Sequence, residues 1–337
     1  MRLRVGLVGL GDVWHARHAP ALRAMADRFE IRAVCDQVGR RAEQAAEEFH
    51  ADPVDGYRAL ACREDIDAVM VLSPQWYGAL PILAACEAGK AVYCAAGLDL
   101  STEETQLIKR RAEETGVAFV AEFPRRQAPA TIRLKELIAT RLGLPHLLFC
   151  HQRSVVEPPT SPATKPHPNP VTRYLLEQVD WCRYVANLEA NYVTGVVHHA
   201  ADGSGAEDYQ MMTLDFSPRE KCGSGPIAQI SCGRYVPSGW QEAISFRPLA
   251  ALQVSCERGI AFVDLPTTLV WFDEAGRHQE SLDSERPVGE QLLMHFYRCV
   301  TSLVRKSCDL EDAYKAVSIV QACRRSHQEG RRIELQY

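Results

Sequence analysis

Two glycines directly after a short apolar run are the residues with the clearest chemical meaning in this sequence. Residues 5–8 are apolar and contain β-branched side chains, a pattern typical of a buried parallel strand, and Gly9 and Gly11 follow it. Glycines let the backbone approach a pyrophosphate closely, and the free amides at the start of the following helix bind it. The stretch therefore predicts a turn that binds the diphosphate of a dinucleotide cofactor. Asp12 and Val13 are predicted to contact the same cofactor.

The next polar residue of interest closes the second predicted strand. Residues 30–35 form that strand, and Asp36 after it is placed to accept hydrogen bonds from the adenosine ribose hydroxyls. An acid there would repel the 2′-phosphate of NADP, so the sequence favours NAD as the cofactor. Arg40 and Arg41 would partly offset that repulsion, which leaves NADP possible. Trp14 departs from the fingerprint, which has Gly or Ala at that position, so an ordinary strand-to-helix turn stays open as the alternative.

Strands and helices then alternate along the first part of the chain. Predicted strands at 68–72, 91–94 and 118–121 are separated by predicted helices at 77–88 and 101–115. This alternation indicates an α/β fold, a Rossmann-type doubly wound parallel sheet over residues 1–125, whose ligand lies at the carboxyl ends of the strands. The loops at those ends supply the remaining candidates: Ser73, Pro74 and Cys94 for the cofactor, and Trp76 and Tyr77 for the substrate.

The chain beyond the first domain has a different pattern. Residues 126–337 contain several strand-like runs separated by short turns with glycine, such as 257–259 and 274–276, so hairpins join consecutive strands. We expect an α+β domain with an open, mostly antiparallel sheet that binds substrate and mediates oligomerisation. Two closing helices within 288–328 should brace the first domain. The predicted strands are 191–198, 209–216, 227–236, 250–256, 260–265 and 268–272.

Composition limits the classes of partner. The chain has 337 residues, too many for one ordinary core, and a formal net charge of −5 without a long basic cluster, so neither nucleic acid nor an anionic membrane is an expected partner. No apolar run is long enough for a signal core or a membrane span, and we expect a cytoplasmic protein. The twelve cysteines are scattered singly without CxxC or zinc spacing, which predicts buried thiols and no metal site.

Several short motifs together resemble a known family. The chain is similar to the Gfo/Idh/MocA family, the glucose-fructose oxidoreductase and inositol dehydrogenase group, over nearly its full length. That resemblance implies NAD(P)-dependent redox chemistry at a sugar or cyclitol hydroxyl. It also implies a homo-oligomer, a dimer or tetramer, formed through the uncovered face of the C-terminal sheet, which would otherwise be an exposed patch. The motifs that carry the resemblance are 5–11, His18 with 20–22, 33–36, 65–69, 73–74, 88–94 and 125–126 with Pro129.

The departures from the family concern its reactive groups. Family members usually have Glu-Lys-Pro after the fifth strand, where this chain has Ala-Ala-Gly at 95–97, and a His in the loop where it has residues 75–78. The family's Asp-x-x-x-His motif aligns best with Arg173 and Glu177, although that alignment could slip by one helical turn. If it holds, all three usual polar catalytic groups are absent.

Carbonyl–alcohol redox chemistry needs a proton donor or acceptor, which typically contributes about 10²–10⁴-fold to the rate. Tyr174 and Glu177 are the predicted replacements, and Arg126, Arg173 and His198 are predicted substrate contacts; packing and surface roles remain open for each. Lys165, on a proline-rich segment at 157–171, Tyr77 and His199 are weaker candidates. That segment is either a flap over the cleft or a plain surface crossover. Two functions therefore remain: an oxidoreductase, or a cofactor- or sugar-binding protein or non-redox enzyme.

Overall fold

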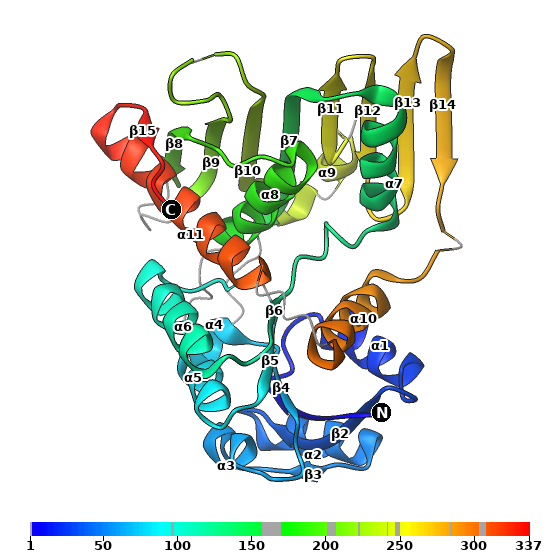
Figure 1. Cartoon of the computed structure of the whole chain (residues 1–337), viewed down its shortest axis with the longest axis vertical. Coiled ribbons are helices and arrows are strands. Elements are labelled where there is room, and N and C mark those ends of the chain that lie inside the picture. The colour runs from blue at the N-terminus through cyan, green and yellow to red at the C-terminus, as the bar shows by residue number, and fades with distance from the viewer. Residues whose placement is uncertain are drawn as a thin grey trace. The chain divides into compact units, whose positions relative to one another are not determined.

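The computed structural model describes most of the chain (Figure 1). The proline-rich segment with Lys165, and the positions Ala96 and Gly97, lie outside the described residues. The described ranges are 2–95, 98–156, 170–200, 207–221, 223–240, 242–246, 250–283, 285–302 and 308–337.

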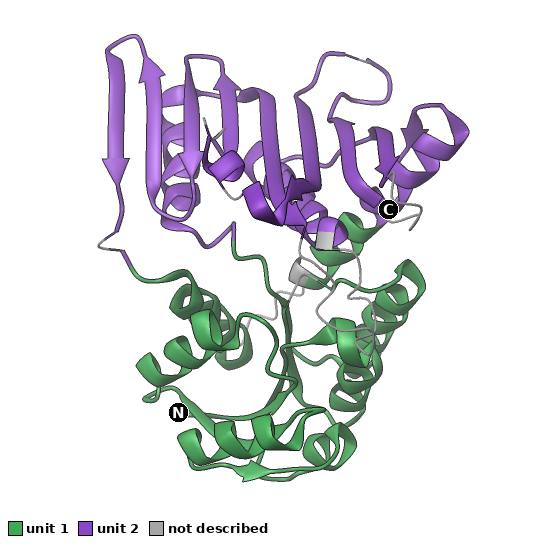
Figure 2. Cartoon of the chain, turned by 180° about the vertical axis from the view of Figure 1, so that it is seen from behind, with its two compact units in different colours: residues 1–124, 286–317 green, residues 125–285, 318–337 purple. Residues whose placement is uncertain are grey.

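The chain packs into two compact units, coloured separately in Figure 2. Unit 1 consists of residues 1–124 together with 286–317, and unit 2 consists of residues 125–285 together with 318–337. Each unit is built from two separate stretches of the sequence, because the chain returns to unit 1 after the long run of strands in unit 2.

Unit 1 is built on a parallel sheet, as the alternation of strands and helices predicted. Within the described residues it has six strands in the order β3-β2-β1-β4-β5-β6, and every neighbouring pair is parallel. The order steps outward from β1 in both directions, so the carboxyl ends of β1 and β4 adjoin at the switch point where such folds bind ligands. The strands are β1 (Leu3–Val8), β2 (Phe29–Cys35), β3 (Asp52–Pro53), β4 (Ala68–Val71), β5 (Ala91–Cys94) and β6 (Phe119–Ala121).

Helices cover both faces of this sheet. The helix after the glycine turn opens as a π-helical turn, η1 (Trp14–His18), before α1 (Ala19–Ala24), where the sequence predicted one helix. Gly78, in the left-handed region at φ +64°, separates two helices that were predicted as one. The others are α2 (Gly39–Phe49), α3 (Tyr57–Ala61), α4 (Pro74–Tyr77), α5 (Leu80–Glu87), α6 (Thr102–Thr115) and α10 (Val288–Thr301).

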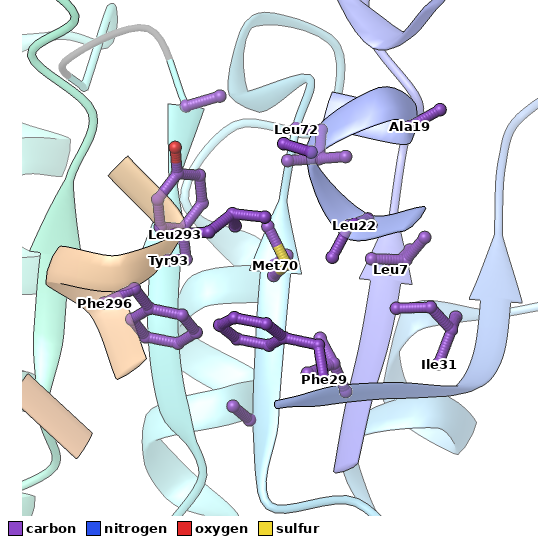
Figure 3. Packing of buried hydrophobic residues seen from close by; sticks show 14 of the residues in the cluster. Leu7, Ala19, Leu22, Phe29, Ile31, Met70, Leu72, Tyr93, Leu293 and Phe296 are labelled. Atoms are coloured by element: carbon purple, nitrogen blue, oxygen red, sulfur yellow. The ribbon is translucent and has the colours of Figure 1, made fainter. Parts of the chain in front are cut away.

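Apolar side chains on the two faces of the sheet form two cores. On one face, Leu7 and Phe29 pack with Tyr93 and with Phe296 of α10, and the Phe29 and Phe296 rings stack with centroids 6.4 Å apart (Figure 3). On the other face, Val8 and its neighbours pack against α3, α5 and α6. The two cores bury both faces of the strands, as expected for a parallel sheet.

Unit 2 contains a broad mixed sheet, which confirms the predicted open and mostly antiparallel domain. In the described part it has nine strands in the order β14-β13-β12-β11-β7-β10-β9-β8-β15, and all neighbouring pairs are antiparallel except β7 with β10. The strands are β7 (Pro145–Val156), β8 (Tyr192–His199), β9 (Glu207–Asp215), β10 (Ile227–Pro237), β11 (Leu252–Cys256), β12 (Gly259–Asp264), β13 (Thr268–Asp273), β14 (Gly276–Ser281) and β15 (Ile333–Glu334).

One face of the unit 2 sheet is covered by helices. These are α7 (Pro129–Leu137), continued by η3 (Ile138–Leu142), then α8 (Pro170–Ala186) and the end of α11 (Cys308–Glu329). Leu148 and Cys150 of β7 point toward α8 and are fully buried, whereas Leu147 on the opposite face is exposed. Two short helices, η4 (Ser238–Trp240) and α9 (Glu242–Ser245), follow β10.

Candidate active site

The glycine turn after β1 has the geometry that a close-approach site requires. Gly9 and Gly11 have φ angles of +67° and +66°, a region that favours glycine. A Cβ added to Gly11 would lie 2.5 Å from the carbonyl oxygen of Leu72, which no side chain could tolerate. The Gly9 amide also donates to the carbonyl of Cys35 at 2.8 Å, so the turn is tied to the end of β2. These contacts explain why both positions are glycine.

Asp36 is fixed beside this turn by backbone amides. Its Oδ2 accepts a hydrogen bond from the Leu10 amide at 2.9 Å, and its Oδ1 accepts one from the Val38 amide at 2.9 Å. Each carboxylate oxygen can accept more than one hydrogen bond, so the group keeps the capacity to accept from ribose hydroxyls. Arg41 donates to the Gly11 carbonyl at 3.4 Å and lies at the same site.

Trp14 does not fill the space beside the glycine turn. Its side chain is 2% exposed and belongs to the core, where its ring meets Phe49 edge-on at a centroid distance of 5.8 Å. A pocket remains open next to the turn, and Trp14 does not line it. Seven predicted site residues line this pocket with Gln37 and Arg41: Gly9, Gly11, Asp12, Asp36, Ser73, Trp76 and Tyr77.

Tyr77 and Trp76, predicted as substrate contacts, lie against the glycine turn. A Cβ on Gly9 would be 3.0 Å from Tyr77 Cε2, so the phenol ring packs directly over that glycine. Burial, followed by the neighbouring Cys35, raises the pKa of Tyr77 well above its usual value. Trp76 is 43% exposed and receives a hydrogen bond on its carbonyl from Gln37 at 3.4 Å. Both residues therefore line the pocket beside the glycine turn.

The other predicted cofactor contacts are more deeply placed. Pro74 and Cys94 are buried, Val13 is half-buried, and none of the three lines the pocket. Burial raises the pKa of the Cys94 thiol far above its usual range, so it is not a thiolate. Ala95, which the resemblance aligns with the first residue of Glu-Lys-Pro, is 2% exposed. Its side chain supplies no polar group.

A buried ionic cluster at the end of β6 is absent from the sequence-based set of site residues. Glu122 is 1% exposed. One of its carboxylate oxygens hydrogen-bonds His18 Nε2 at 2.9 Å, and the other accepts a hydrogen bond from Arg17. Burial alone would raise the pKa of Glu122, but the charges and hydrogen bonds of His18 and Arg17 overcome this effect and lower it to about 2. The His18 motif was recognised, but nothing in the local sequence linked it to a residue about one hundred positions later.

Two further buried atoms adjoin this cluster. Among the described residues, neither His18 Nδ1 nor Tyr93 Oη has a hydrogen-bond partner. Burial, followed by the nearby Glu122 charge, raises the pKa of Tyr93 well above its usual value. The Tyr93 ring meets His18 edge-on with centroids 6.4 Å apart.

In unit 2, the predicted catalytic Glu177 is held by two guanidinium groups. Arg125 Nε approaches one Glu177 oxygen at 3.4 Å, and Arg173 Nε approaches the other at 3.8 Å from one turn earlier on α8. Arg125 also donates to Gln152 at 2.6 Å and lies over the Trp181 ring. Both oxygens of Glu177 thus face guanidinium groups, so the carboxylate is held in place by its ion pairs.

Tyr174, Arg126 and His198 lie in different surroundings. Tyr174 is half-buried on α8, and its hydroxyl makes no hydrogen bond to another described residue. Arg126 forms a bidentate ion pair with the buried Asp180, with Nε to Oδ2 at 2.6 Å. His198 is exposed and its Nδ1 lies 2.7 Å from Asp208 Oδ1, and a register shift between His198 and His199 leaves both side chains exposed.

Unit 2 also has a polar cavity of about 390 Å³ that the sequence analysis did not identify. His151 of β7 and Ser231 of β10 meet there, with Nδ1 and Oγ 2.8 Å apart, and burial lowers the pKa of His151. Both side chains point away from α8, because they alternate with the buried Cys150 and Ile230. The cavity is lined by His151, Gln152, Arg153, Tyr209, Ser231, Tyr235, Ile244, Ala251, Asp264 and Leu265.

Neither a metal centre nor a membrane-spanning helix is found among the described residues. No group of three or more His, Cys, Asp or Glu side chains in the described ranges is arranged to hold a metal ion. Across those same ranges, none of the helices combines the length and apolar character that crossing a membrane requires.

A doubly wound parallel sheet with a left-handed glycine turn and a fixed acid after β2 defines a dinucleotide-binding protein of the Rossmann class. Comparison with known proteins agrees. Residues 3–123 match the profile of GFO_IDH_MocA, described as an oxidoreductase family with an NAD-binding Rossmann fold.

Individual relatives are similar to parts or to the whole of the chain. A dTDP-3,4-didehydro-2,6-dideoxy-alpha-D-glucose 3-reductase from Actinomadura kijaniata is 34% identical over 121 residues, which is 36% of each chain. An inositol 2-dehydrogenase from Cereibacter sphaeroides is 29% identical over 202 residues, 58% of this chain and 57% of that protein. These two alignments thus span about a third and just over half of the relatives' own lengths.

Among solved structures, a levoglucosan dehydrogenase in complex with NADH and levoglucosan matches the whole of both chains with a TM-score of 0.84. Its identity is 17%, so this likeness concerns the fold. The family match thus concerns residues 3–123, and unit 1 has the NAD-binding Rossmann fold that the family description names.

The Glu122 cluster gives a pH-dependent prediction. A carboxyl whose pKa is lower in the folded than in the unfolded chain contributes stability above its unfolded pKa, and this contribution disappears as the pH falls through the folded pKa. The wild type should therefore lose stability between about pH 4.5 and 2, the usual and the folded pKa of Glu122. The variant E122Q should be less stable at pH 7 by about 3–5 kcal/mol, since Arg17 and the buried His18 lose the negative charge with which they pair. Over the acid range its unfolding free energy should depend less on pH.

Urea unfolding at several pH values measures this dependence. The exposed Glu43→Gln on α2 is the control and should follow the wild type. An E122Q curve parallel to that of the wild type from pH 4.5 to 2 would contradict the assignment of this stability to Glu122.

Proposed function

We propose that this protein is an NAD-dependent oxidoreductase that acts on a small polyhydroxylated compound of the sugar or cyclitol class. The observation that carries the proposal is the intact cofactor cradle, in which left-handed Gly9 and Gly11 lie beside an Asp36 held by two backbone amides. The space that a Cβ would occupy at Gly11 is bounded by a backbone carbonyl, so these positions fit the close approach of a diphosphate. The similarity to an inositol 2-dehydrogenase supports the substrate class.

The charges at the cradle favour NAD over NADP. Asp36 has its carboxylate beside the glycine turn, where a 2′-phosphate would meet a negative charge. Arg41, the cation nearest to this position in the pocket, is directed to the Gly11 carbonyl. Arg40 is exposed and does not line the pocket. These placements support NAD as the cofactor that binds here.

Hydride transfer is the chemistry that a bound nicotinamide supplies, so the chain's own residues must position the substrate and move a proton. Of the two predicted residues, Glu177 is occupied by Arg125 and Arg173 and acts in orientation. Tyr174 is the candidate proton carrier, because its hydroxyl has no hydrogen-bond partner among the described residues. The Ala95 position offers no polar side chain for this role.

The unit 2 cavity fits the substrate class by its chemistry. A polyol presents hydroxyl groups that donate and accept hydrogen bonds, together with apolar C–H faces. His151 and Ser231 offer the first kind of contact, and the rings of Tyr209 and Tyr235, 6.2 Å apart and edge-on, offer the second. We propose that this cavity binds a sugar-like molecule at a place separate from Tyr174, because its His151 and Ser231 side chains lie on the face of the sheet opposite α8.

A second function, cofactor binding without turnover, is favoured by a different observation. Arg126 is committed to Asp180, and both Arg125 and Arg173 are committed to Glu177, so the polar residues on and beside α8 neutralise one another. A site in which acids and bases are paired in this way provides orientation but weak proton transfer. The protein would then act as a sensor of the nucleotide or sugar.

We also propose a homo-oligomer in which a second copy covers the open face of the unit 2 sheet. Val196 is 46% exposed on that face, and Leu147 and Phe272 are 41% and 39% exposed. Half-buried apolar side chains on the same face extend the patch across several strands, which is unusual for a surface that stays free. These are Phe149, Met211, Ile260, Phe262 and Val270.

Cofactor binding gives the first prediction for this function. Isothermal titration should detect NADH binding to the wild type, and Asp36→Asn should weaken it about tenfold, because a charge-assisted hydrogen bond to the ribose becomes a neutral one. NADPH binding should weaken less in the same variant. The exposed Asp55→Asn should bind NADH as the wild type does. Absence of any binding of NADH and NADPH at millimolar concentration would remove the proposal.

Turnover gives the second prediction. We expect a change in NADH absorbance with at least one member of a panel of sugars, cyclitols and their keto forms. Tyr174→Phe should lower kcat about 10²-fold or more with little change in KM, because it removes the proton carrier and not the binding surface. Leu188→Ala, an exposed residue after α8, is the matched control. Tight NADH binding without turnover on the panel would instead select the binding function.

The oligomer is tested by sedimentation. The wild type should sediment as a dimer or larger species, and Val196→Glu should dissociate it, because a buried unpaired carboxylate opposes association. Leu188→Glu, at an equally exposed apolar residue outside the sheet, should leave the mass unchanged. A monomeric wild type at micromolar concentration would show that the open face has another role.

A further inference from the structure

The buried cluster at the end of β6 has no part in the function proposed above. Arg17 and His18 are consecutive residues in the first turn after the glycine loop, and both bind the carboxylate of Glu122. The Glu122 amide donates to the Cys94 carbonyl at 2.8 Å, so its backbone is fixed to the end of β5. The cluster therefore connects the start of the helix that follows the glycine turn to the far strands of the sheet.

The helical geometry at this point is unusual and suits the cluster. In η1, the amides of both Arg17 and His18 donate to the carbonyl of Val13, at 2.8 and 3.4 Å. In a regular α-helix, consecutive side chains point about 100° apart. The Glu122 carboxylate is nonetheless reached by both side chains, one on each oxygen. π-turns are rare and occur frequently at functional sites.

A buried ionic cluster of this kind holds η1 and the end of β6 firmly together. Removing a carboxylate from water is costly, and the cost is recovered only when its partners are well placed. Glu122 and His18 are 1% and 2% exposed, and the Arg17 side chain is 25% exposed. Displacing η1 away from β6 would leave a buried charge without a partner. The position of η1, and with it the preceding residues of the turn, is therefore fixed by Glu122.

We propose that Glu122 is a positioning residue for the cofactor: through Arg17 and His18 it holds the turn from Gly9 to Val13 so that its backbone amides face the diphosphate. This inference rests on the proposed nucleotide-binding function. Glu122 itself touches no cofactor, because it is buried among its partners. The opposing possibility is that the cluster only stabilises the fold, in which case its loss would lower stability without a selective effect on diphosphate binding.

Binding of two ligands distinguishes these possibilities. ADP-ribose carries the diphosphate, whereas adenosine carries the ribose that Asp36 would bind but no phosphate. For E122Q we expect the Kd of ADP-ribose, measured by isothermal titration, to rise about tenfold or more, as when supporting groups around a bound ligand are removed. The Kd of adenosine, measured by NMR titration, should be unchanged. Unchanged or tighter ADP-ribose binding would overturn the proposal, since released Arg17 charge near a diphosphate could only strengthen binding.

Two control variants accompany this experiment. Tyr93→Phe removes an unbonded hydroxyl beside the same carboxylate and should leave both affinities as in the wild type. Asp67→Asn weakens an ion pair with Arg4 at the amino ends of the strands, and should lower stability without changing either affinity. If E122Q does not fold, Arg17→Met replaces it, because the Arg17 side chain is partly exposed and its loss is less disruptive.

Hydrogen exchange of the ligand-free protein tests the positioning separately from nucleotide binding. Amides from Leu10 to His18 should exchange at least about tenfold faster in the cluster variant than in Asp67→Asn, relative to the other amides of unit 1. If the wild type binds neither ligand, the proposed function fails while this measurement still decides the role of Glu122. Equal exchange rates in the two variants would show that Glu122 does not hold the turn.

Discussion

The constraint on which unit 1 depends is the close approach of backbone to backbone at the switch point of its sheet. Gly11 can follow β1 only because no Cβ meets the Leu72 carbonyl at the end of β4, and Gly9 hydrogen-bonds the end of β2. Three strand ends are thus joined through one turn. Asp36 receives the Leu10 amide from that turn and the Val38 amide from its own segment, so the acid is fixed to the glycine turn. Any side chain at Gly11 would separate the strands that the cradle needs.

The carboxylates of this protein differ in the groups that bind them. These groups decide which carboxylate is able to bind a ligand. Glu122 and Asp180 are buried and neutralised by arginines, with His18 as a further partner of Glu122, and so serve the structure. Glu177 is partly buried and lies between two arginines. Asp36 accepts hydrogen bonds from the neutral backbone amides of Leu10 and Val38, and it lines the pocket beside the glycine turn together with Arg41. A hydroxyl-rich ligand group is what such a carboxylate attracts.

The sequence predicted features that depend on nearby residues. The apolar run before Gly9, the alternation of strands and helices, and the position of Asp36 after a strand were sufficient to predict the parallel sheet. Strand-like runs separated by glycine turns predicted the mostly antiparallel sheet that follows it. The π-turn at η1 was not predicted, because it depends on the bond between residues brought together from β6 and the glycine loop. The cavity with His151 and Ser231 requires the parallel pairing of β7 with β10, strands about eighty residues apart, and no local pattern shows such a pairing.

The tandem arginines at 125 and 126 show how the proposed proton carrier would be held in place. Arg125 binds Glu177 and Arg126 binds Asp180, residues three apart and therefore on one face of α8. Two adjacent ion pairs at successive turns fix both the rotation of a helix about its axis and its position along that axis, whereas a single pair would not. Tyr174 lies three residues before Glu177, so its direction follows from the same pairs. The two arginine pairs therefore determine the orientation of α8, and with it the place from which Tyr174 would exchange a proton.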